Sequence, residues 1–308
     1  MQKNARTTNF IAGAAIALAF SFTLQAGVNR TFVATTGNDA NVSVNCSATA
    51  YCRTFGVALS VTNAGGEVVV VNSGGYGSAT ISQPVTITAN GIDASITETT
   101  SGDSALTINT TGNVTITGLN LFGGGSGTYG ILVSQVGFLR LYSMQIQGFA
   151  QDGIYFTSTT PGNLAMYNSK INDSGHDGLL LYSSGSRAWV DNSDFDNNAF
   201  AGADSALGKL DVADSYAHYN EYGFFADGGT VVLYNCRAIF NHIGVAASGT
   251  SGVNGVGHLY FTACLLADNT DAWVAGSGGV LSGSSPGTTL VAPGQATSGT
   301  MTAAQTLQ

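Results

Sequence analysis

Charged residues are scarce in this sequence. Asp, Glu, Lys and Arg make up 9% of its 308 residues, and only nine residues are Lys or Arg. Amphipathic helices need a charged face, so the composition argues against a mainly helical protein. The formal net charge of −9 argues against nucleic acid or an anionic membrane surface as a partner, because both are bound through clusters of Lys and Arg.

Glycine and hydrophobic residues are abundant instead. The chain has 42 glycines and is 44% hydrophobic, which allows a sizeable core connected by many turns. A glycine followed by a short apolar stretch recurs at intervals of 21 to 25 residues, at Gly153, Gly178, Gly202, Gly223 and Gly244. A regular interval of this size indicates one structural unit that is repeated along the chain.

Each unit has two further strand-like segments. Pairs of apolar residues separated by one position indicate a strand with one buried face, and they occur at 85/87, 114/116, 139/141, 164/166, 188/190, 210/212, 231/233 and 259/261. Two residues later, from the second pair on, stands a residue suited to a tight turn: Gly118, Ser143, Asn168, Asn192, Asp214, Asn235 or Ala263. Another apolar residue follows after three positions, and the glycine stretch completes the unit.

Three short strands per unit, with asparagine repeated at one tight turn, resemble the right-handed parallel β-helix of the pectate-lyase-like superfamily. Asn168, Asn192 and Asn235 carry this resemblance, because stacked amides can bond to their equivalents in neighbouring coils. It covers roughly residues 30–276. We therefore predict an all-β solenoid of about eight to nine coils, with a short capping helix near the N-terminus.

Four segments are expected along the chain. Residues 1–26 have the parts of a secretory signal peptide, namely Lys3 and Arg6, an apolar run and then Ala26. We expect residues 27–67 to form an N-terminal cap with a cysteine loop and a short helix, 68–276 the β-helix, and 277–308 a C-terminal cap or flexible tail. The protein is then secreted, periplasmic or extracellular, without a membrane span after signal removal; an uncleaved anchor is the alternative.

The four cysteines form two groups. Cys46 and Cys52 lie in one short polar loop, where an oxidising compartment favours a disulfide. Cys236 and Cys264 occupy nearly equivalent positions of neighbouring repeats. A stacked disulfide and a buried reduced pair are both compatible with that spacing.

Acidic residues precede or follow the repeated glycine in three repeats. Asp152 and Asp177 come directly before Gly153 and Gly178, His176 precedes Asp177, and Asp204 lies one repeat further on. Stacked coils would bring these carboxylates close enough to serve as acid and base of a glycosidase. The pattern resembles polygalacturonases, although Ala201 replaces an expected aspartate; a structural turn is the alternative interpretation.

Outward-facing aromatic residues are candidate glycan contacts, because sugar rings stack on aromatic rings. Tyr155 and Phe225 belong to the glycine-led strand, whereas Trp189 and Tyr167 belong to the first strand of the unit. The run from Trp189 to Asn192 also resembles a pectate lyase motif, with Asn192 in place of histidine. Coverage of these rings by loops is the alternative.

A second polar cluster is expected on the middle strand. Asp196 and His218 fall in one outward column and could form an acid–base pair or two ligands of a weak metal site. Two ligands are too few to predict a metal, so a solvated polar face with ion pairs is the alternative. The cofactor stays undefined; calcium is compatible with the acidic residues but has no supporting motif.

The sequence therefore favours an exported β-helix that contacts a polysaccharide or cell-surface glycan through its outer face. A glycoside hydrolase or lyase acting on pectin-like glycans is one form of this hypothesis. The alternative is a non-catalytic surface protein, an adhesin or a purely structural solenoid, because β-helices also occur without enzymatic activity. The sequence indicates no oligomeric state.

Overall fold

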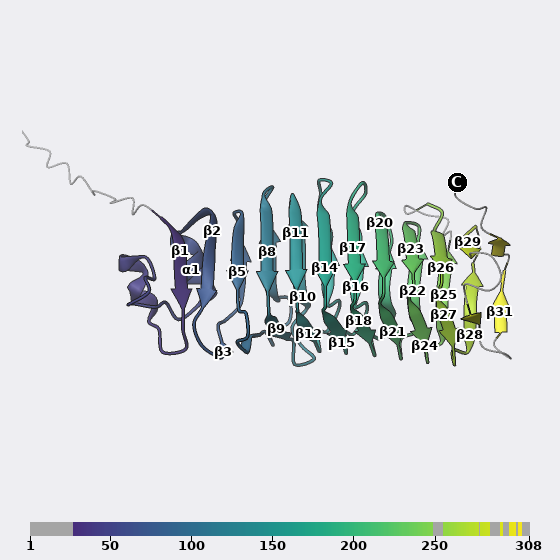
Figure 1. Cartoon of the computed structure of the whole chain (residues 1–308), viewed down its shortest axis with the longest axis horizontal. Coiled ribbons are helices and arrows are strands. Elements are labelled where there is room, and N and C mark those ends of the chain that lie inside the picture. Colours follow the sequence, from purple (N-terminus) through teal and green to yellow (C-terminus); the bar gives the residue numbers. More distant parts are fainter. Residues whose placement is uncertain are drawn as a thin grey trace, which may run out of the picture.

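The computed structural model describes residues 27–248, 255–276, 278–283, 290–291, 296–299 and 301–303. Figure 1 shows short strands stacked in successive coils along the long axis, with a small helix at the N-terminal end. Every strand pairing between neighbouring coils is parallel. The predicted signal segment 1–26 lies outside the described residues.

The strands form three sheets. Each complete coil contributes one strand to each sheet, and sheet A has one further strand at either end. Sheet A contains β1 (Val28–Val33), β2 (Thr62–Val70), β5 (Val85–Thr88), β8 (Asn113–Thr117), β11 (Phe138–Tyr142), β14 (Asn163–Tyr167), β17 (Arg187–Asp191), β20 (Lys209–Ala213), β23 (Thr230–Tyr234), β26 (His258–Thr262), β29 (Val280–Gly283) and β32 (Met301–Ala303). Sheet B contains β3 (Gly74–Gly75), β6 (Ala94–Thr97), β9 (Leu119–Phe122), β12 (Gln145–Gln147), β15 (Lys170–Asn172), β18 (Asp194–Asp196), β21 (Tyr216–His218), β24 (Arg237–Ile239), β27 (Leu265–Ala267) and β30 (Leu290–Val291). Sheet C contains β4 (Ala79–Ile81), β7 (Ser104–Asn109), β10 (Tyr129–Gln135), β13 (Ile154–Phe156), β16 (Leu179–Leu181), β19 (Ala201–Ser205), β22 (Tyr222–Asp227), β25 (Ile243–Ser248), β28 (Asp271–Ala275) and β31 (Ala296–Ser298).

The core is a column of apolar side chains inside the coils. In sheet A, Leu139, Leu164 and Ala188 are in register and fully buried, as alternation in the sequence predicts. The prediction of an all-β solenoid with three parallel strands per coil is confirmed. Beyond Gly276 the chain continues the same pairing, because β29, β30, β31 and β32 add strands to the three sheets.

The N-terminal end is covered by a short helix and a stapled loop. Helix α1 (Phe55–Val61) buries Phe55, Ala58, Leu59 and Val61, and the Thr54 side chain accepts a hydrogen bond from the backbone of Val57 at its start. This is the short helix expected in the N-terminal cap, and it is followed directly by β2, which begins at Thr62. A 3-10 helix, η1 (Asp39–Val44), precedes the disulfide between Cys46 and Cys52, whose sulfurs are 1.98 Å apart.

Two turns of each coil use left-handed backbone geometry. The first includes Asn168 and Asn192, with φ of 50° and 45°, and the Asn192 amide donates to the Asn168 side chain at 2.7 Å. The second turn precedes a buried ladder of asparagines, which the sequence pattern did not predict. In this ladder the backbone N–H of each asparagine donates to the side-chain oxygen of the asparagine in the next coil, in the order Asn198, Asn220, Asn241 and Asn269.

Candidate functional site

Six of the predicted site residues lie on or at the edge of the outer face of sheet C: Asp152, Tyr155, His176, Asp177, Asp204 and Phe225. Tyr155, Leu180, Asp204 and Phe225 lie side by side on neighbouring strands, in the register predicted from the repeat. Asp152 and Asp177 are each separated by one glycine from the first residue of β13 and β16. They therefore lie at the edge of the face where these strands begin.

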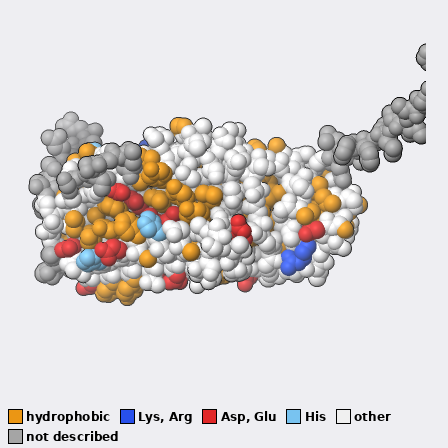
Figure 2. Space-filling view, turned by 180° about the vertical axis from the view of Figure 1, so that it is seen from behind, with side chains coloured by type: hydrophobic (Ala, Val, Ile, Leu, Met, Phe, Trp, Pro, Cys, Tyr) orange, Lys and Arg blue, Asp and Glu red, His pale blue; other side chains and the backbone are white. Residues whose placement is uncertain are grey.

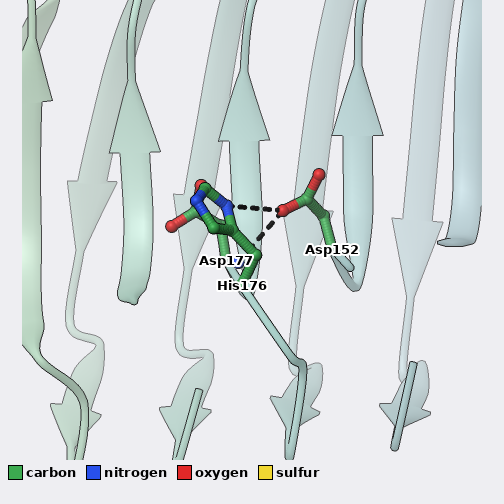
Figure 3. A group of neighbouring side chains, drawn as sticks. All are labelled: Asp152, His176 and Asp177. Atoms are coloured by element: carbon green, nitrogen blue, oxygen red, sulfur yellow. Dashed lines mark hydrogen bonds and ion pairs between the residues drawn. The ribbon is translucent and has the colours of Figure 1, made fainter. Parts of the chain in front are cut away.

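Asp152, His176 and Asp177 form one compact cluster, with potential ligand atoms all within 4.8 Å of one another. The His176 Nδ1 lies 3.1 Å from Oδ1 of Asp152 and 2.9 Å from Oδ2 of Asp177 (Figure 3). The carboxylates also bind backbone of the next coil: Asp152 Oδ1 accepts from the Asp177 N–H at 3.0 Å, and Asp177 Oδ1 from the Ala201 N–H at 2.9 Å. The two carboxylates therefore connect neighbouring coils as well as binding the imidazole.

The cluster has unequal exposure and strongly altered protonation. The Asp177 side chain is fully buried, whereas the His176 side chain is 44% exposed. Hydrogen bonding to Asp152 and then to Asp177 raises the pKa of His176 to about 10. Burial raises the pKa of Asp177, an effect that the neighbouring imidazolium opposes. At neutral pH the cluster is best described as an imidazolium held between two carboxylates.

We expect the stabilising effect of His176 to disappear at alkaline pH. The folded-state pKa lies above the ordinary value of 6.5, so the contribution is complete below about pH 6.5 and is lost as the pH rises through about 10. After discounting for solvent screening of a partly exposed ring, His176→Gln should reduce the free energy of unfolding by about 1 to 2 kcal/mol near neutrality. Urea unfolding across this pH range measures the difference.

His242→Gln is the matched control for this experiment. His242 also contacts a carboxylate, with its Nδ1 2.7 Å from Glu221, but the pair is exposed. The control should lose a few tenths of a kcal/mol. A difference between wild type and His176→Gln that stays constant, or grows, as the pH approaches 10 would contradict the assigned ion pair.

Asp204 is not part of the three-residue cluster, although it lies on the same face. Its side chain is buried, and one oxygen accepts a long hydrogen bond of 3.4 Å from the Asp227 N–H. Burial, and then the charges of Asp177 and Asp227, raise its pKa well above the ordinary range. Asp204 thus carries a proton at a pH at which an exposed aspartate is ionised.

Aromatic rings extend across sheet C on both sides of these acids. Tyr129 and Tyr155 have ring centroids 5.0 Å apart, and Phe200 packs on His176 at 4.8 Å and on Tyr222 at 5.1 Å. Phe225 was predicted to contact a glycan, but it is only 6% exposed because Phe200 and Tyr222 pack against it. The accessible rings beside it are therefore Phe200 and Tyr222.

The other predicted residues lie on different faces. Trp189 and Tyr167 point outward from sheet A, where Trp189 contacts Phe138 at 6.1 Å and Tyr167 stacks on Tyr142 at 5.2 Å. They cannot share one flat surface with Tyr155, which belongs to sheet C. The four aromatic candidates are therefore divided between two surfaces.

Asp196 and His218 are neighbours on sheet B and belong to a network of ion pairs. His218 lies 3.1 Å from Asp196 and 2.8 Å from Asp194, and Lys170 lies 3.1 Å from Asp196. With both imidazole nitrogens and the lysine engaged, these residues match the alternative of a polar face with ion pairs.

Cys236 and Cys264 are reduced and buried in neighbouring coils. Their thiols donate to the carbonyls of Tyr234 and Thr262 at 3.3 Å each. They occupy the turn position at which Ser169, Ser193 and Ser215 make the same bond in earlier coils. The pair thus continues a structural ladder.

Comparison with known proteins gives the family. The model for the right handed beta helix region matches residues 57–209 and 104–291. The chain belongs to this right-handed β-helix family. No curated protein matches the chain by sequence. In the part of the β-helix chain that is described, no helix is long and apolar enough to cross a membrane.

Solved structures share the fold at low sequence identity. Alginate lyase from Paenibacillus sp. str. FPU-7 superposes with a TM-score of 0.61 and 16% identity, over 89% of this β-helix chain and 99% of that chain. Pectate lyase Pel9A gives 0.47 and 18%, over 91% and 78%. The A-module of mannuronan C-5 epimerase AlgE4 from Azotobacter vinelandii gives 0.45 and 12%, over 78% and 91%.

Sequence reasoning missed two ring positions of this β-helix. Tyr222 precedes Gly223 as Asp152 precedes Gly153, and Phe200 precedes Ala201 as His176 precedes Asp177. The positions one and two residues before the repeated glycine, which hold Asp177 and His176 in one coil, hold these rings in later coils. The same two offsets therefore predict both rings.

Proposed function

We propose that the protein binds polysaccharide through the outer face of sheet C. The observation that carries this proposal is the set of partly exposed rings of Tyr155, Phe200 and Tyr222 beside the polar cluster of Asp152 and His176. Figure 2 views the molecule from behind and has hydrophobic side chains gathered with acidic and histidine side chains over its C-terminal half. Sugar rings combine an apolar face with hydroxyl groups, so they match such a surface.

Fold similarity and the expected export agree with this proposal. The alginate lyase that superposes over nearly its whole length is named for action on a polysaccharide. The signal-like segment expected at residues 1–26 would place the protein where extracellular glycans occur, and the Cys46–Cys52 disulfide is compatible with an oxidising compartment. Export is part of the proposal.

The same geometry favours binding over turnover. Asp152, Asp177 and Asp204 are 4%, 0% and 3% exposed, and a general acid or base must come within hydrogen-bond distance of the reacting group. All three carboxylates already accept backbone hydrogen bonds from the next coil. The predicted catalytic roles of these residues and of His176 thus remain predictions.

Removing the exposed rings should weaken binding. We expect Tyr222→Ala, and separately Phe200→Ala, to raise the Kd for a bound oligosaccharide by about 3- to 10-fold, through loss of ring stacking. Isothermal titration with a panel of oligosaccharides gives the Kd, and reducing-end release from the same samples reports turnover. Tyr234→Ala, at an exposed tyrosine on sheet A, is the matched control.

Two results would contradict the proposal. One is the absence of binding to every glycan in the panel by a folded protein. The other is an equal loss of binding in Tyr234→Ala, because sheet A and not sheet C would then be the binding face.

A further inference from the structure

The outer face of sheet C is acidic and lacks the long cationic side chains. None of the described strands of sheet C contains Lys or Arg. The seven described Lys and Arg residues lie elsewhere, on sheet A, on sheet B or next to α1: Arg30, Arg140, Arg187, Lys209, Lys170, Arg237 and Arg53. In Figure 2 the visible Lys and Arg colour lies mainly at the N-terminal end, away from the patch.

Acidic groups line this face from its middle to its C-terminal end: Asp152, Asp177, Asp204, Glu221, Asp227 and Asp271. The only described basic side chains in the same columns are His176 and His242. Even with both imidazoles charged and Asp204 neutral, five carboxylates oppose two cations. The face therefore presents a negative potential beside its aromatic rings.

These carboxylates differ in their capacity for another donor. Oδ2 of Asp177 is fully buried, with the His176 Nδ1 2.9 Å away, so it is not open to a ligand. Asp227 is partly exposed, and among the described residues its carboxylate accepts one side-chain hydrogen bond, from the Ser248 hydroxyl at 3.2 Å. Burial, and then the charges of Glu221 and Asp227, raise the pKa of Tyr222, which is consistent with both acids lying near this partly exposed ring.

This charge pattern selects among glycans. A polyuronate carries one carboxylate on each sugar and would meet a face that repels it, with no Lys or Arg to form ion pairs. A neutral glycan would cover ionised groups without supplying a positive charge. A protonated amine on a pyranose ring supplies that charge while the ring still stacks on the aromatic side chains.

We infer that the glycan bound at the outer face of sheet C is cationic, a polymer of amino sugars with free amines. This inference rests on the proposed function and adds the substrate class. Its chemical basis is complementarity between sugar ammonium groups and the carboxylates beside Phe200 and Tyr222.

The test compares oligosaccharides of equal length that carry positive, neutral or negative charge. Glucosamine, N-acetylglucosamine, glucose and mannuronate oligomers are titrated into the protein at a mildly acidic pH, at which the sugar amines are protonated. We expect the glucosamine oligomer to bind about tenfold more tightly than its N-acetylated form, and this preference to fall in concentrated salt.

Asp227→Asn tests the location of the charge effect, because the amide oxygen can still accept from Ser248. It should weaken binding of the glucosamine oligomer about two- to fivefold and leave the N-acetylglucosamine oligomer unchanged. Asp191→Asn makes the same change in charge on sheet A and should alter neither Kd.

The outcomes separate the inference from the proposed function. Equal binding of glucosamine and N-acetylglucosamine oligomers, weakened by Tyr222→Ala, overturns the cationic ligand and retains glycan binding at sheet C. Tightest binding of the mannuronate oligomer, weakened by Arg187→Gln on sheet A, overturns both the charge and the face. No binding of any oligomer overturns the proposed function together with the inference.

Discussion

Gly178→Ala should unfold the protein at a markedly lower urea concentration than wild type. A methyl group at this position would lie 2.4 Å from the backbone oxygen of Gly202 and 3.0 Å from both Asn198 Nδ2 and Phe195 Cδ1. The backbone oxygen cannot move without separating two coils. We therefore expect a loss of about 2 to 3 kcal/mol in the free energy of unfolding.

The matched control is the same substitution at a site without neighbours. A methyl group on Gly56, in helix α1, meets nothing within 4 Å, and alanine restricts the unfolded chain. Gly56→Ala should gain about 0.5 to 1 kcal/mol. Opposite shifts in the urea midpoint at unchanged m-value would support this account. A neutral Gly178→Ala would show that coil spacing adapts, and that the repeated glycines are not required for close approach.

The glycine column also shows what the sequence could and could not establish. Spacing alone placed Gly153 and Gly178 one coil apart, and it therefore placed Asp152 beside Asp177. Neither glycine has a left-handed backbone, so conformational freedom is not the reason for glycine at these positions. They are small because a neighbouring coil passes close to them, which is a tertiary requirement that a single sequence does not reveal.

Side-chain coverage was the second feature beyond the reach of the sequence. Alternation correctly placed Phe225 on the outside of its strand, but an outward position does not fix exposure. Phe200 from the preceding coil and Tyr222 from the start of the same strand pack against Phe225 and exclude water. The direction of a strand residue follows from period-two alternation, whereas its accessibility depends on the lengths and directions of side chains on its own strand and in the adjacent coil.

The buried asparagine ladder was missed for a related reason. Its turns place Tyr219 and Phe240 in left-handed geometry, with φ of 58° and 57°. Bulky aromatic residues rarely occupy that region, so turn propensity gave no signal there. The tertiary hydrogen bonds of Asn220 and Asn241 override this local preference and make the ladder a part of the core.

Asn220→Ala should therefore be among the most destabilising single changes in the chain. The Asn220 side chain accepts from the backbone N–H of Asn198 at 2.9 Å, and its amide donates to the carbonyls of Phe195 and His218 at 3.1 and 3.0 Å. Alanine would leave these buried groups without a partner and open a cavity. We expect a loss of about 3 to 4 kcal/mol, measured by urea unfolding.

Two comparison variants separate the ladder from a general effect of removing an amide. Asn172→Ala removes a half-buried amide on β15 that donates to its neighbour Asp173, so the loss should stay within about 0.5 kcal/mol. Asn220→Asp keeps the acceptor but loses the donors and introduces a buried charge. Burial raises the pKa of such a carboxyl, so this variant should lose stability progressively as the pH rises above the ordinary aspartate value. Equal losses in Asn172→Ala and Asn220→Ala, or no pH dependence in Asn220→Asp, would show that the ladder is not the source of the stability.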